Sequence, residues 1–240
     1  MSNTDITPDK LERRSFLYRK FDKSKVTWSI ILNYATVSSI IDLDKETNGA
    51  KHLALSDLSY LQRIGFKGEG ACEWLKKQNI QIPITVNDSL QDTNGCLIAR
   101  LGINDILILD NIKRETSVPI TLEKLWHQDY SQSNKPCGFI MPRQESHACF
   151  SISGSRAPEM FAKLCAIDLR TEKFDNKKIT QTSLARLGAI IIRNDLNTLI
   201  NYLVLVESAS AEYCWDCLLD AMQEFLGQTI GNSALTVLAS

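Results

Sequence analysis

The sequence predicts an α+β fold made of two similar strand–helix–strand–strand units. The main observation is a repeat, in which residues 67–78 (KGEGACEWLKKQ) and 153–164 (SGSRAPEMFAKL) share a glycine, an alanine and a lysine at a displacement of 86 positions. A second phrase, IARLG at 98–102, returns at the same displacement as LARLG at 184–188. Two matches at one displacement indicate a duplication in which neither half buries its sheet face alone. The alternative is a chance similarity between two amphipathic helices.

The first copy is predicted to begin with a strand in residues 60–68 (YLQRIGFKG), which ends in a glycine-rich turn. A helix follows, and its apolar face contains Ala71, Trp74, Leu75 and Ile80. After a polar linker, residues 96–110 (CLIARLGINDILILD) indicate two strands joined by a turn at 102–105.

The second copy is predicted to begin with a strand at 147–154 (HACFSISG), where apolar and polar residues alternate. The next helix has Ser155 as a candidate N-cap and Pro158 in its first turn, where the missing N–H costs little. Its apolar face contains Ala157, Met160, Phe161, Leu164 and Cys165. Two further strands are expected at 183–194 (SLARLGAIIIRN) and 202–208 (YLVLVES). Since Trp74 and Phe161 occupy nearly equivalent places in the two copies, both are expected to be buried.

The last predicted helix lies in residues 208–227 (SASAEYCWDCLLDAMQEFLG) and ends at Gly227. Its apolar residues recur at helical spacing: Cys214, Cys217, Leu218, Ala221, Met222 and Phe225. We therefore expect an N-terminal arm and leading strand region at 1–50, followed by a single domain at 51–240. That domain would consist of two similar halves, 51–135 and 136–240.

The composition excludes several classes of protein. With 44% hydrophobic and 23% charged residues, the chain has the content of a soluble globular protein. The net charge of −1 lacks the basic excess of a nucleic-acid-binding protein, and no apolar run approaches the ~18–20 residues of a membrane helix. We expect neither nucleic acid nor membrane as a partner.

A cytoplasmic location is expected from the N-terminal segment and the cysteines. Residues 13–17 (RRSFL) look like the start of a twin-arginine export signal, but charged residues follow where about 7–15 apolar residues are required. Seven cysteines without a signal peptide favour reduced, mostly buried thiols.

No catalytic, cofactor-binding or metal-binding residue is predicted. Gly68-x-Gly70 lacks the third glycine of a dinucleotide fingerprint, and there is no P-loop. Cys214-x-x-Cys217 allows a redox pair or half a zinc site, but helical spacing places both sulfurs on the apolar face and favours core packing.

His147 and Cys149 share one strand face, and Asp168 is a candidate orienting acid for nucleophilic chemistry. The sequence shows neither an oxyanion hole nor a cleft beside them, which favours a hydrogen-bonded structural histidine.

Four segments of the chain resemble the gamma subunit of heterotetrameric sarcosine oxidase. They are 55–75 (LSDLSYLQRIGFKGEGACEWL), 143–170 (RQESHACFSISGSRAPEMFAKLCAIDLR), 178–193 (KITQTSLARLGAIIIR) and 207–222 (ESASAEYCWDCLLDAM). The resemblance runs from about Arg13 to Gly231, and its most specific blocks contain His147, Asp168–Leu169, Gln181–Thr182 and Ser208–Trp215. That family is similar in fold to the folate-binding domain of the glycine-cleavage T-protein, which also has a pseudo-duplicated α+β core.

The resemblance implies a non-catalytic structural subunit of a bacterial complex. Such a complex oxidatively demethylates sarcosine to glycine, with oxygen as electron acceptor, and transfers the one-carbon unit to tetrahydrofolate. The partners would be the alpha, beta and delta subunits, with FAD, FMN, NAD and tetrahydrofolate on the alpha and beta chains and no cofactor on this one.

Two alternatives stay open. One is a free-standing folate-dependent enzyme such as an aminomethyltransferase, although the T-protein has a further C-terminal region. The other is a folate-binding protein that supports iron–sulfur assembly, although residues 135–140 (KPCGFI) depart from its Lys-Gly-Cys-Tyr-x-Gly-Gln-Glu signature at most positions.

The candidate partner surface is a row of acids on the last helix, spaced four residues apart: Glu212, Asp216, Asp220 and Glu224. A basic strip on the alpha chain would complement this row, and the contact would be sensitive to salt. A second contact of opposite sign is expected from a basic N-terminal segment that contains Arg13, Arg14, Arg19, Lys20, Lys23 and Lys25. The plainer interpretation is an ordinary solvated face.

Overall fold

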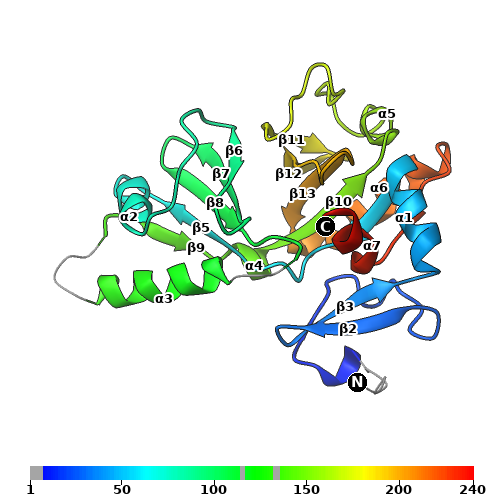
Figure 1. Cartoon of the computed structure of the whole chain (residues 1–240), viewed down its shortest axis with the longest axis horizontal. Helices are drawn as coiled ribbons and strands as arrows, with labels where there is room; N and C mark the ends of the chain where they lie inside the picture. The colour runs from blue at the N-terminus through cyan, green and yellow to red at the C-terminus, as the bar shows by residue number, and fades with distance from the viewer. Residues whose placement is uncertain (1–7, 114–116, 132–135) are drawn as a thin grey trace. The chain divides into compact units, whose positions relative to one another are not determined.

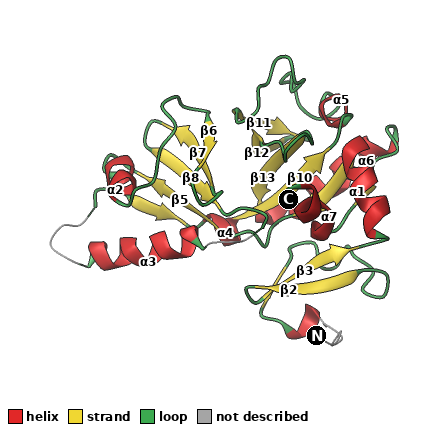
Figure 2. Ribbon diagram, in the orientation of Figure 1, coloured by secondary structure: helices red, strands yellow, loops and turns green. Residues whose placement is uncertain are grey.

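The computed structural model describes residues 8–113, 117–131 and 136–240. The chain forms two compact units, which Figures 1 and 2 show as mixed layers of strands and helices. Unit 1 contains Met1–Tyr60, His147–Asn176 and Thr182–Ser240, and unit 2 contains Leu61–Ser146 and Lys177–Gln181. Among the described residues, no helix has the length and apolar character needed to cross a membrane.

Unit 2 is built on a five-stranded sheet with the order β6-β7-β8-β5-β9. Its strands are β5 (Arg63–Lys67), β6 (Ser89–Gln91), β7 (Leu97–Gly102), β8 (Asp105–Leu109) and β9 (Phe139–Met141). Its helices are α2 (Ala71–Lys77), α3 (Val118–Tyr130) and α4 (Arg143–Ser146). The rings of Phe66, Trp74 and Trp126 join β5, α2 and α3 in one cluster, with centroids 4.8–5.3 Å apart. Both α2 and α3 therefore pack on the same core.

Unit 1 is built on a six-stranded sheet with the order β11-β12-β13-β10-β4-β14. Its strands are β4 (Ala54–Asp57), β10 (His147–Ser153), β11 (Ile179–Leu184), β12 (Leu187–Arg193), β13 (Asn201–Glu207) and β14 (Gln228–Thr229), and β11 starts within unit 2. Its helices are α1 (Leu43–His52), α5 (Ala157–Phe161), α6 (Ala211–Gln223) and α7 (Asn232–Leu238), with short 3-10 turns at Pro8–Lys10 and Ser208–Ser210. A small N-terminal sheet, ordered β1-β3-β2, contains β1 (Arg13–Arg14), β2 (Thr27–Ile31) and β3 (Tyr34–Ser39).

The predicted α+β duplication is confirmed by the strand orders. The order β6-β7-β8-β5 in unit 2 matches β11-β12-β13-β10 in unit 1. In unit 2, β5 leads into α2 through Gly68, whose φ is +125°. In unit 1, β10 leads into α5 through Gly154, whose φ is +109°. The Gly68 carbonyl accepts from Ala71 N at 3.0 Å, and the Gly154 carbonyl accepts from Ala157 N at 3.2 Å. The repeated glycine therefore makes one kind of strand-to-helix turn twice, in a backbone region that other residues rarely adopt.

The repeated ARLG phrase is not part of this duplication. Ala99 and Arg100 lie inside β7, paired with Leu107 and Ile106 of β8. Ala185 and Arg186 instead form the two-residue turn between β11 and β12, with φ of +48° and +67°. In one copy the phrase lies in the first strand of the β7–β8 hairpin, and in the other it forms the turn of the β11–β12 hairpin. Because turn position sets strand register, the two phrases do not fall at equivalent points of the two sheets.

The two copies exchange their leading strands. Strand β4 precedes the first copy along the chain but pairs with β10 of the second, with Phe150 opposite Asp57 and Ser153 opposite Ala54. Strand β9 precedes the second copy but pairs with β5 of the first, with Phe66 opposite Ile140. The compact units therefore divide the chain differently from the predicted halves 51–135 and 136–240.

Several local predictions need correction. Strand β10 has the predicted alternation of apolar and polar residues, but its polar positions are covered too, and every residue except His147 is buried. Helix α5 has only five residues and its N-cap position is Arg156, so Ser155 is not the cap. At the end of α6 the positive φ of +54° belongs to Leu226, and Gly227 is required for a close approach to Met222.

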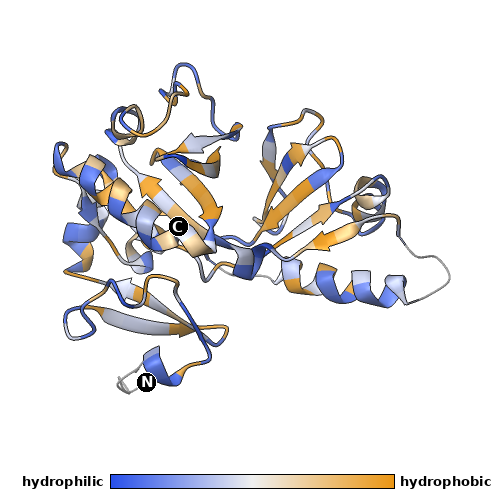
Figure 3. Cartoon of the chain, turned by 180° about the vertical axis from the view of Figure 1, so that it is seen from behind, coloured by the Kyte–Doolittle hydropathy of each residue, from blue (hydrophilic) through white to orange (hydrophobic). Residues whose placement is uncertain are grey.

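The hydrophobic cores lie between these helices and the sheets. In unit 1, Phe150, Phe161, Tyr202 and Trp215 are almost completely buried between α5, α6 and the sheet. Figure 3 shows apolar residues concentrated on the strands of both units, whereas much of α3 is hydrophilic. Trp74 is 6% exposed and Phe161 is 0% exposed, so the predicted burial of both is confirmed.

Candidate partner-binding surface

Helix α6 presents the predicted acidic row to solvent. Its buried face, which contains Cys214, Trp215, Leu218 and Met222, packs into the core of unit 1. Because an α-helix repeats every 3.6 residues, acids spaced by four fall together on the other face. The four members, Glu212, Asp216, Asp220 and Glu224, are all exposed. The row therefore exists as a surface feature, which we call the acidic row.

Two members of the acidic row already bind lysines of this chain. The Lys20 ammonium lies 2.6 Å from Asp216 Oδ2, and the Lys163 ammonium lies 3.0 Å from Glu224 Oε2. The Asp216 hydrogen bond, with a smaller contribution from the Glu212 charge, raises the pKa of Lys20 above its ordinary value. Within the described parts of the chain, Glu212 and Asp220 form no ion pair. The row consequently has two acids available to a cation from outside.

The segment that carries Lys20 also packs against α6 through an aromatic ring. The Phe21 ring meets Trp215 edge-on at 5.7 Å and Trp28 at 6.3 Å between centroids. Trp28 belongs to β2, so these contacts join α6 to the N-terminal sheet. An ionic and an apolar contact together hold residues 20–21 on α6.

The predicted basic N-terminal segment does not form one uniform patch. Arg14 and Arg19 stack over the Tyr18 ring, with guanidinium carbons 4.3 and 5.1 Å from its centroid, and Arg13 lies 6.0 Å from the Tyr34 ring centroid. Lys23 pairs with Asp9, which lowers the pKa of that carboxyl. The remaining two cations point to different partners, since Lys20 binds Asp216 and Lys25 binds Asp22.

Two buried carboxylates join the N-terminal residues to the rest of unit 1, and neither was predicted from the sequence. Glu46 is 0% exposed and accepts from Ser39 Oγ at 2.9 Å and from the backbone N–H groups of Ile40, Ile41 and Gly231 at 2.6–2.8 Å. Asp57 accepts from the Ser15 hydroxyl and from Ser59 N. The Asp-x-Ser spacing of 57–59 was an available local signal, because an aspartate side chain readily accepts from the backbone N–H two residues on.

Only one of the two cysteines on α6 packs fully into the core. Cys214 is fully buried, and this burial raises the pKa of its thiol to about 12. Cys217 is half-buried and hydrogen-bonds to Tyr213, which raises the pKa of the tyrosine. All seven cysteines are free thiols, and no group of three His, Cys, Asp or Glu side chains in the described residues has metal-binding geometry.

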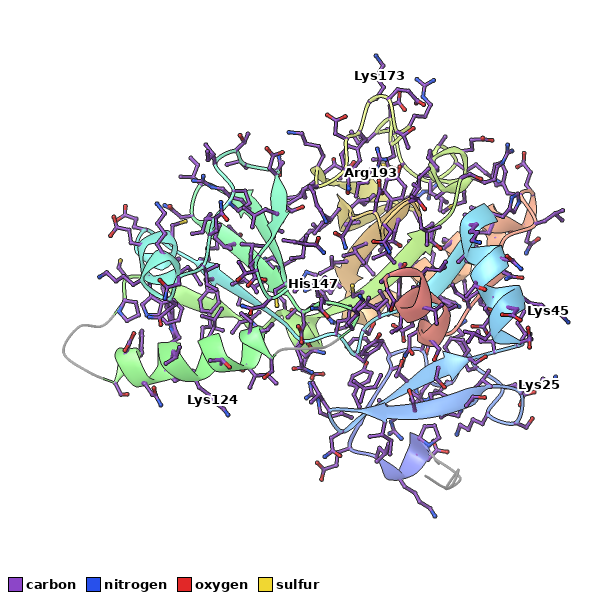
Figure 4. All side chains as sticks on the ribbon, in the orientation of Figure 1. Lys25, Lys45, Lys124, His147, Lys173 and Arg193 are labelled. Atoms are coloured by element: carbon purple, nitrogen blue, oxygen red, sulfur yellow. The ribbon has the colours of Figure 1, made fainter. Side chains whose placement is uncertain are left out.

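The second candidate set, His147, Cys149 and Asp168, is spread over two elements. His147 begins β10 (Figure 4), and Cys149, two residues later, is fully buried. Asp168 pairs with Arg170 at 2.6 Å in an exposed loop, and this pairing lowers the pKa of the Asp168 carboxyl to about 2. The carboxylate is thus engaged by an arginine.

Arg193 is a buried cation whose partners belong to this chain. It binds Asp195 at 2.8 Å and the Phe174 carbonyl at 2.7 Å, so it holds the loop before β11 against the sheet. In Figure 4, Lys173 of the same loop extends away from the sheet, whereas Arg193 lies within it. This cation is structural.

Unit 2 has a depression of about 340 Å³ between the end of α2, the β6–β7 loop and the start of α3. Its lining includes Asn79, Asp92, Ser117 and Thr121. The Asp92 carboxylate is already engaged by the N–H groups of Asn94 and Cys96, at 2.9 and 2.8 Å. The one carboxylate of the lining is therefore occupied within its own turn.

The similarity of this chain to known proteins lies in its structure. No protein-family model matches the sequence, and no curated protein matches it. Among solved structures, 32 chains are similar to it.

One similar structure is heterotetrameric sarcosine oxidase from Corynebacterium sp. U-96 in complex with pyrrole 2-carboxylate. It has 19% identity and a TM-score of 0.60 over 76% of this chain and 92% of that chain. Another is glycine cleavage system aminomethyltransferase T from Bartonella henselae, with 14% identity and a TM-score of 0.72 over 95% of this chain and 62% of that chain. At these identities the comparisons define the fold, which is the T-protein-like α+β fold that the sequence predicted.

Proposed function

We propose that this chain is a non-catalytic structural subunit, of the gamma type, in a sarcosine-oxidase-like complex. The observation that carries the proposal is the extent of the structural similarity, which spans 92% of one chain of a heterotetrameric sarcosine oxidase. A chain that matches one subunit almost from end to end is suited to occupy a comparable place in an assembly. The partners would be the alpha, beta and delta subunits, in the cytoplasm.

In this proposal the chemistry belongs to the other chains. FAD, FMN, NAD and tetrahydrofolate would be bound by partner subunits, which would demethylate sarcosine to glycine and pass the one-carbon unit to tetrahydrofolate. The incomplete Gly68-x-Gly70 fingerprint supports this division, since a dinucleotide site of that type needs a third glycine for close helix packing.

The acidic row supports a role in assembly. Glu212 and Asp220 are exposed and have no ion pair among the described residues, so a basic strip on the alpha chain can bind them without first displacing an intrachain cation. Complementary charge of this kind mainly accelerates association and selects the partner. The contact would weaken as salt screens it over about 8–10 Å at physiological ionic strength.

The proposal is tested by purifying the affinity-tagged chain from its native host. We expect larger chains to co-purify in fixed stoichiometry, to show flavin absorbance, and to consume oxygen when sarcosine is added. Purification of the tagged chain alone, or with partners that lack flavin and sarcosine-dependent oxygen consumption, would reject the proposal.

The second candidate is a free-standing folate-binding protein or aminomethyltransferase-like enzyme. It is favoured by the structural similarity to aminomethyltransferase T, which spans 95% of this chain, although this chain covers only 62% of that protein. Calorimetric titration of the purified chain with tetrahydrofolate separates the two candidates. The structural-subunit proposal expects no saturable binding at micromolar concentration and a colourless protein, whereas stoichiometric binding would support the second candidate.

A further inference from the structure

Asparagine is followed by glycine at two places in the chain, Asn48–Gly49 and Asn94–Gly95. The side-chain amide of asparagine reacts with the backbone nitrogen of the next residue when the two come into contact. Glycine at that position favours the contact, because it has no Cβ and its backbone is free to turn. Both asparagines are exposed to solvent. The two pairs therefore differ only in the backbone structure around them.

The first pair lies inside helix α1. Helix geometry directs the Gly49 N–H to the Lys45 carbonyl, and Gly49 O accepts from Leu53 N at 3.0 Å. Leu53 is fully buried, and the Gln228 side chain lies so close that a Cβ on Gly49 would be 1.7 Å from its Nε2. The Gly49 nitrogen reaches the Asn48 side chain only if the chain rotates about the Asn48 Cα–C bond. That rotation would break the last turn of a packed helix, so α1 protects this pair.

The second pair lies in the turn between β6 and β7. The Gly95 N–H donates to Asp92 O at 3.0 Å, which closes the turn, and the φ of Gly95 is +78°. Asn94 O accepts from Asn111 Nδ2 at 2.9 Å, and the reactive Asn94 amide donates one long hydrogen bond of 3.3 Å to Asp92 Oδ2. Rotation about the Asn94 Cα–C bond breaks the first two of these bonds and no helix. The turn therefore leaves this pair able to react.

We propose that Asn94 is a site of spontaneous deamidation, which places a second carboxylate beside Asp92. The Gly95 nitrogen attacks Asn94 Cγ and gives up its proton, the bond from Cγ to Nδ2 breaks, and ammonia leaves. Water then opens the cyclic imide at either of its carbonyls, which yields aspartate or isoaspartate. The net change is amide plus water to carboxylic acid plus ammonia, so water is the only co-reactant.

The new charge falls on a turn that depends on Asp92. Its Oδ1 accepts from the N–H groups of Asn94 and Cys96 at 2.9 and 2.8 Å. Deamidation replaces the Asn94 Nδ2 donor by an oxygen, so that two carboxylates of like charge face each other and repel. The isoaspartate product also lengthens the main chain by one carbon between β6 and β7, where Ser89 is opposite Ala99. Both products therefore loosen the β6–β7 hairpin.

The same turn forms part of the rim of the depression in unit 2. Asp92, Thr93 and Asn94 line it together with neutral polar side chains, which are Gln78, Asn79, Ser117 and Thr121. In the original chain the one carboxylate of the lining is occupied by N–H groups of its own turn. After deamidation the rim has an additional carboxylate that faces Asp92. This surface consequently becomes more acidic as the protein ages.

The test follows both pairs in one preparation of the full chain. The purified chain is incubated for days at pH 7 and at pH 9, either folded or unfolded in urea, and is then digested with trypsin. The pairs fall in separate peptides, 46–51 (ETNGAK) and 78–100 (QNIQIPITVNDSLQDTNGCLIAR). Mass spectrometry measures the conversion of amide to carboxyl, and fragment ions assign it to a residue and separate isoaspartate from aspartate.

We expect Asn94 to be converted at least tenfold faster than Asn48 in the folded chain. In urea, where α1 is absent, the two rates should agree within about twofold. Conversion should be faster at pH 9, because the attacking Gly95 nitrogen must lose its proton. Rates of Asn94 and Asn48 within twofold in the folded chain would overturn the proposal. So would an intact Asn94 in the folded chain under conditions that convert it in urea.

Asn94→Asp reproduces the aspartate product and tests its effect on the hairpin. We expect hydrogen exchange in residues 89–97 to be at least fivefold faster than in the unaltered chain. The control Asn94→Ser removes the same amide without adding a charge, and its exchange should stay within twofold of the unaltered chain. Equal exchange in the two variants would show that the added carboxylate does not loosen the turn.

Discussion

The Lys20 ammonium donates a hydrogen bond of 2.6 Å to the Asp216 carboxylate, and the two residues are 196 positions apart in the chain. Beside this ion pair, the Phe21 ring packs edge-on against Trp215. The basic N-terminal segment and the acidic row were predicted as two separate partner contacts. The structure joins them at this point, so one member of the row is occupied by the chain itself.

Breaking this ion pair should loosen residues 18–26 while the rest of unit 1 stays folded. In Asp216→Lys, a lysine faces Lys20, and the repulsion removes the ionic contact of the segment with α6 while the apolar contact of Phe21 with Trp215 stays. We expect faster proteolysis between residues 18 and 26, measured by mass spectrometry under native conditions. The charge-swapped double variant Lys20→Asp with Asp216→Lys should restore protection, and failure to do so would show that the ion pair does not hold the segment.

Reversing Asp220 tests the acidic row as a partner surface. Because Asp220 has no ion pair among the described residues, Asp220→Lys breaks no ion pair that the structure describes. We expect complex formation to slow at low salt and to approach the unaltered rate at 1 M salt, where the Debye length is about 3 Å. Stopped-flow measurement of association with the partner chains checks this. Identical rates at low salt would make the row an ordinary solvated surface.

Truncation of the two anchoring aromatics should destabilise the fold strongly. Trp74 packs on Phe66 and Trp126, and Phe161 packs on Tyr202 with ring centroids 5.2 Å apart. We expect Trp74→Ala and Phe161→Ala each to lower the free energy of unfolding by about 3–5 kcal/mol, through lost transfer energy and a cavity. Urea denaturation measures the loss. The control Phe139→Ala, at a side chain that is 69% exposed, should change it by less than about 0.5 kcal/mol.

Replacing one oxygen of the buried Glu46 carboxylate should lower the free energy of unfolding. In Glu46→Gln, an amide NH₂ replaces one of the two oxygens, so it meets an N–H donor of Gly231 or of residues 40–41. A buried donor left without an acceptor costs about 1–3 kcal/mol, and we expect a loss of unfolding free energy of that size. Glu123→Gln on the exposed face of α3 is the matched control and should be neutral. Equal stabilities of the two variants would remove Glu46 from the contacts that hold the fold together.

Alkaline pH should destabilise the protein partly through Cys214. Burial raises the pKa of this thiol from 9.0 to about 12. In the unfolded chain the thiol loses its proton from about pH 9, whereas the folded state keeps it, so the free energy of unfolding falls as pH rises from about 9 to 12. Urea denaturation between pH 8 and 10.5 measures this slope. We expect Cys214→Ala to have a shallower slope than the unaltered chain, and equal slopes would contradict the buried protonated thiol.

Elements with strong local signals were predictable from the sequence. The apolar residues at helical spacing predicted α6, and the runs of alternating or continuous apolar residues predicted β8, β10 and β13. The glycines at 68 and 154 revealed the duplication, since each makes the same turn from strand to helix. The Ala-Arg-Leu-Gly phrases misled because sequence displacement alone does not specify where a hairpin turns. In one copy Arg100 faces the loop from within a strand, whereas Arg186 lies in the turn itself.

Patterns along the sequence were enough to predict the α+β class and the two faces of α6, because each depends on residues close together in the chain, and a glycine repeated at a displacement of 86 positions was enough to predict the duplication. Four features became known only from the folded chain: the strands exchanged between the copies, the Lys20–Asp216 ion pair, the donors gathered around Glu46, and the binding of the Ile84 and Ile103 carbonyls by Arg100. Most of those contacts join residues far apart in the chain, so no pattern within a short segment of the sequence predicts them. Strand pairing and ion pairing depend on which surfaces meet once the chain is compact, and that is set by burying the whole core rather than by any one segment.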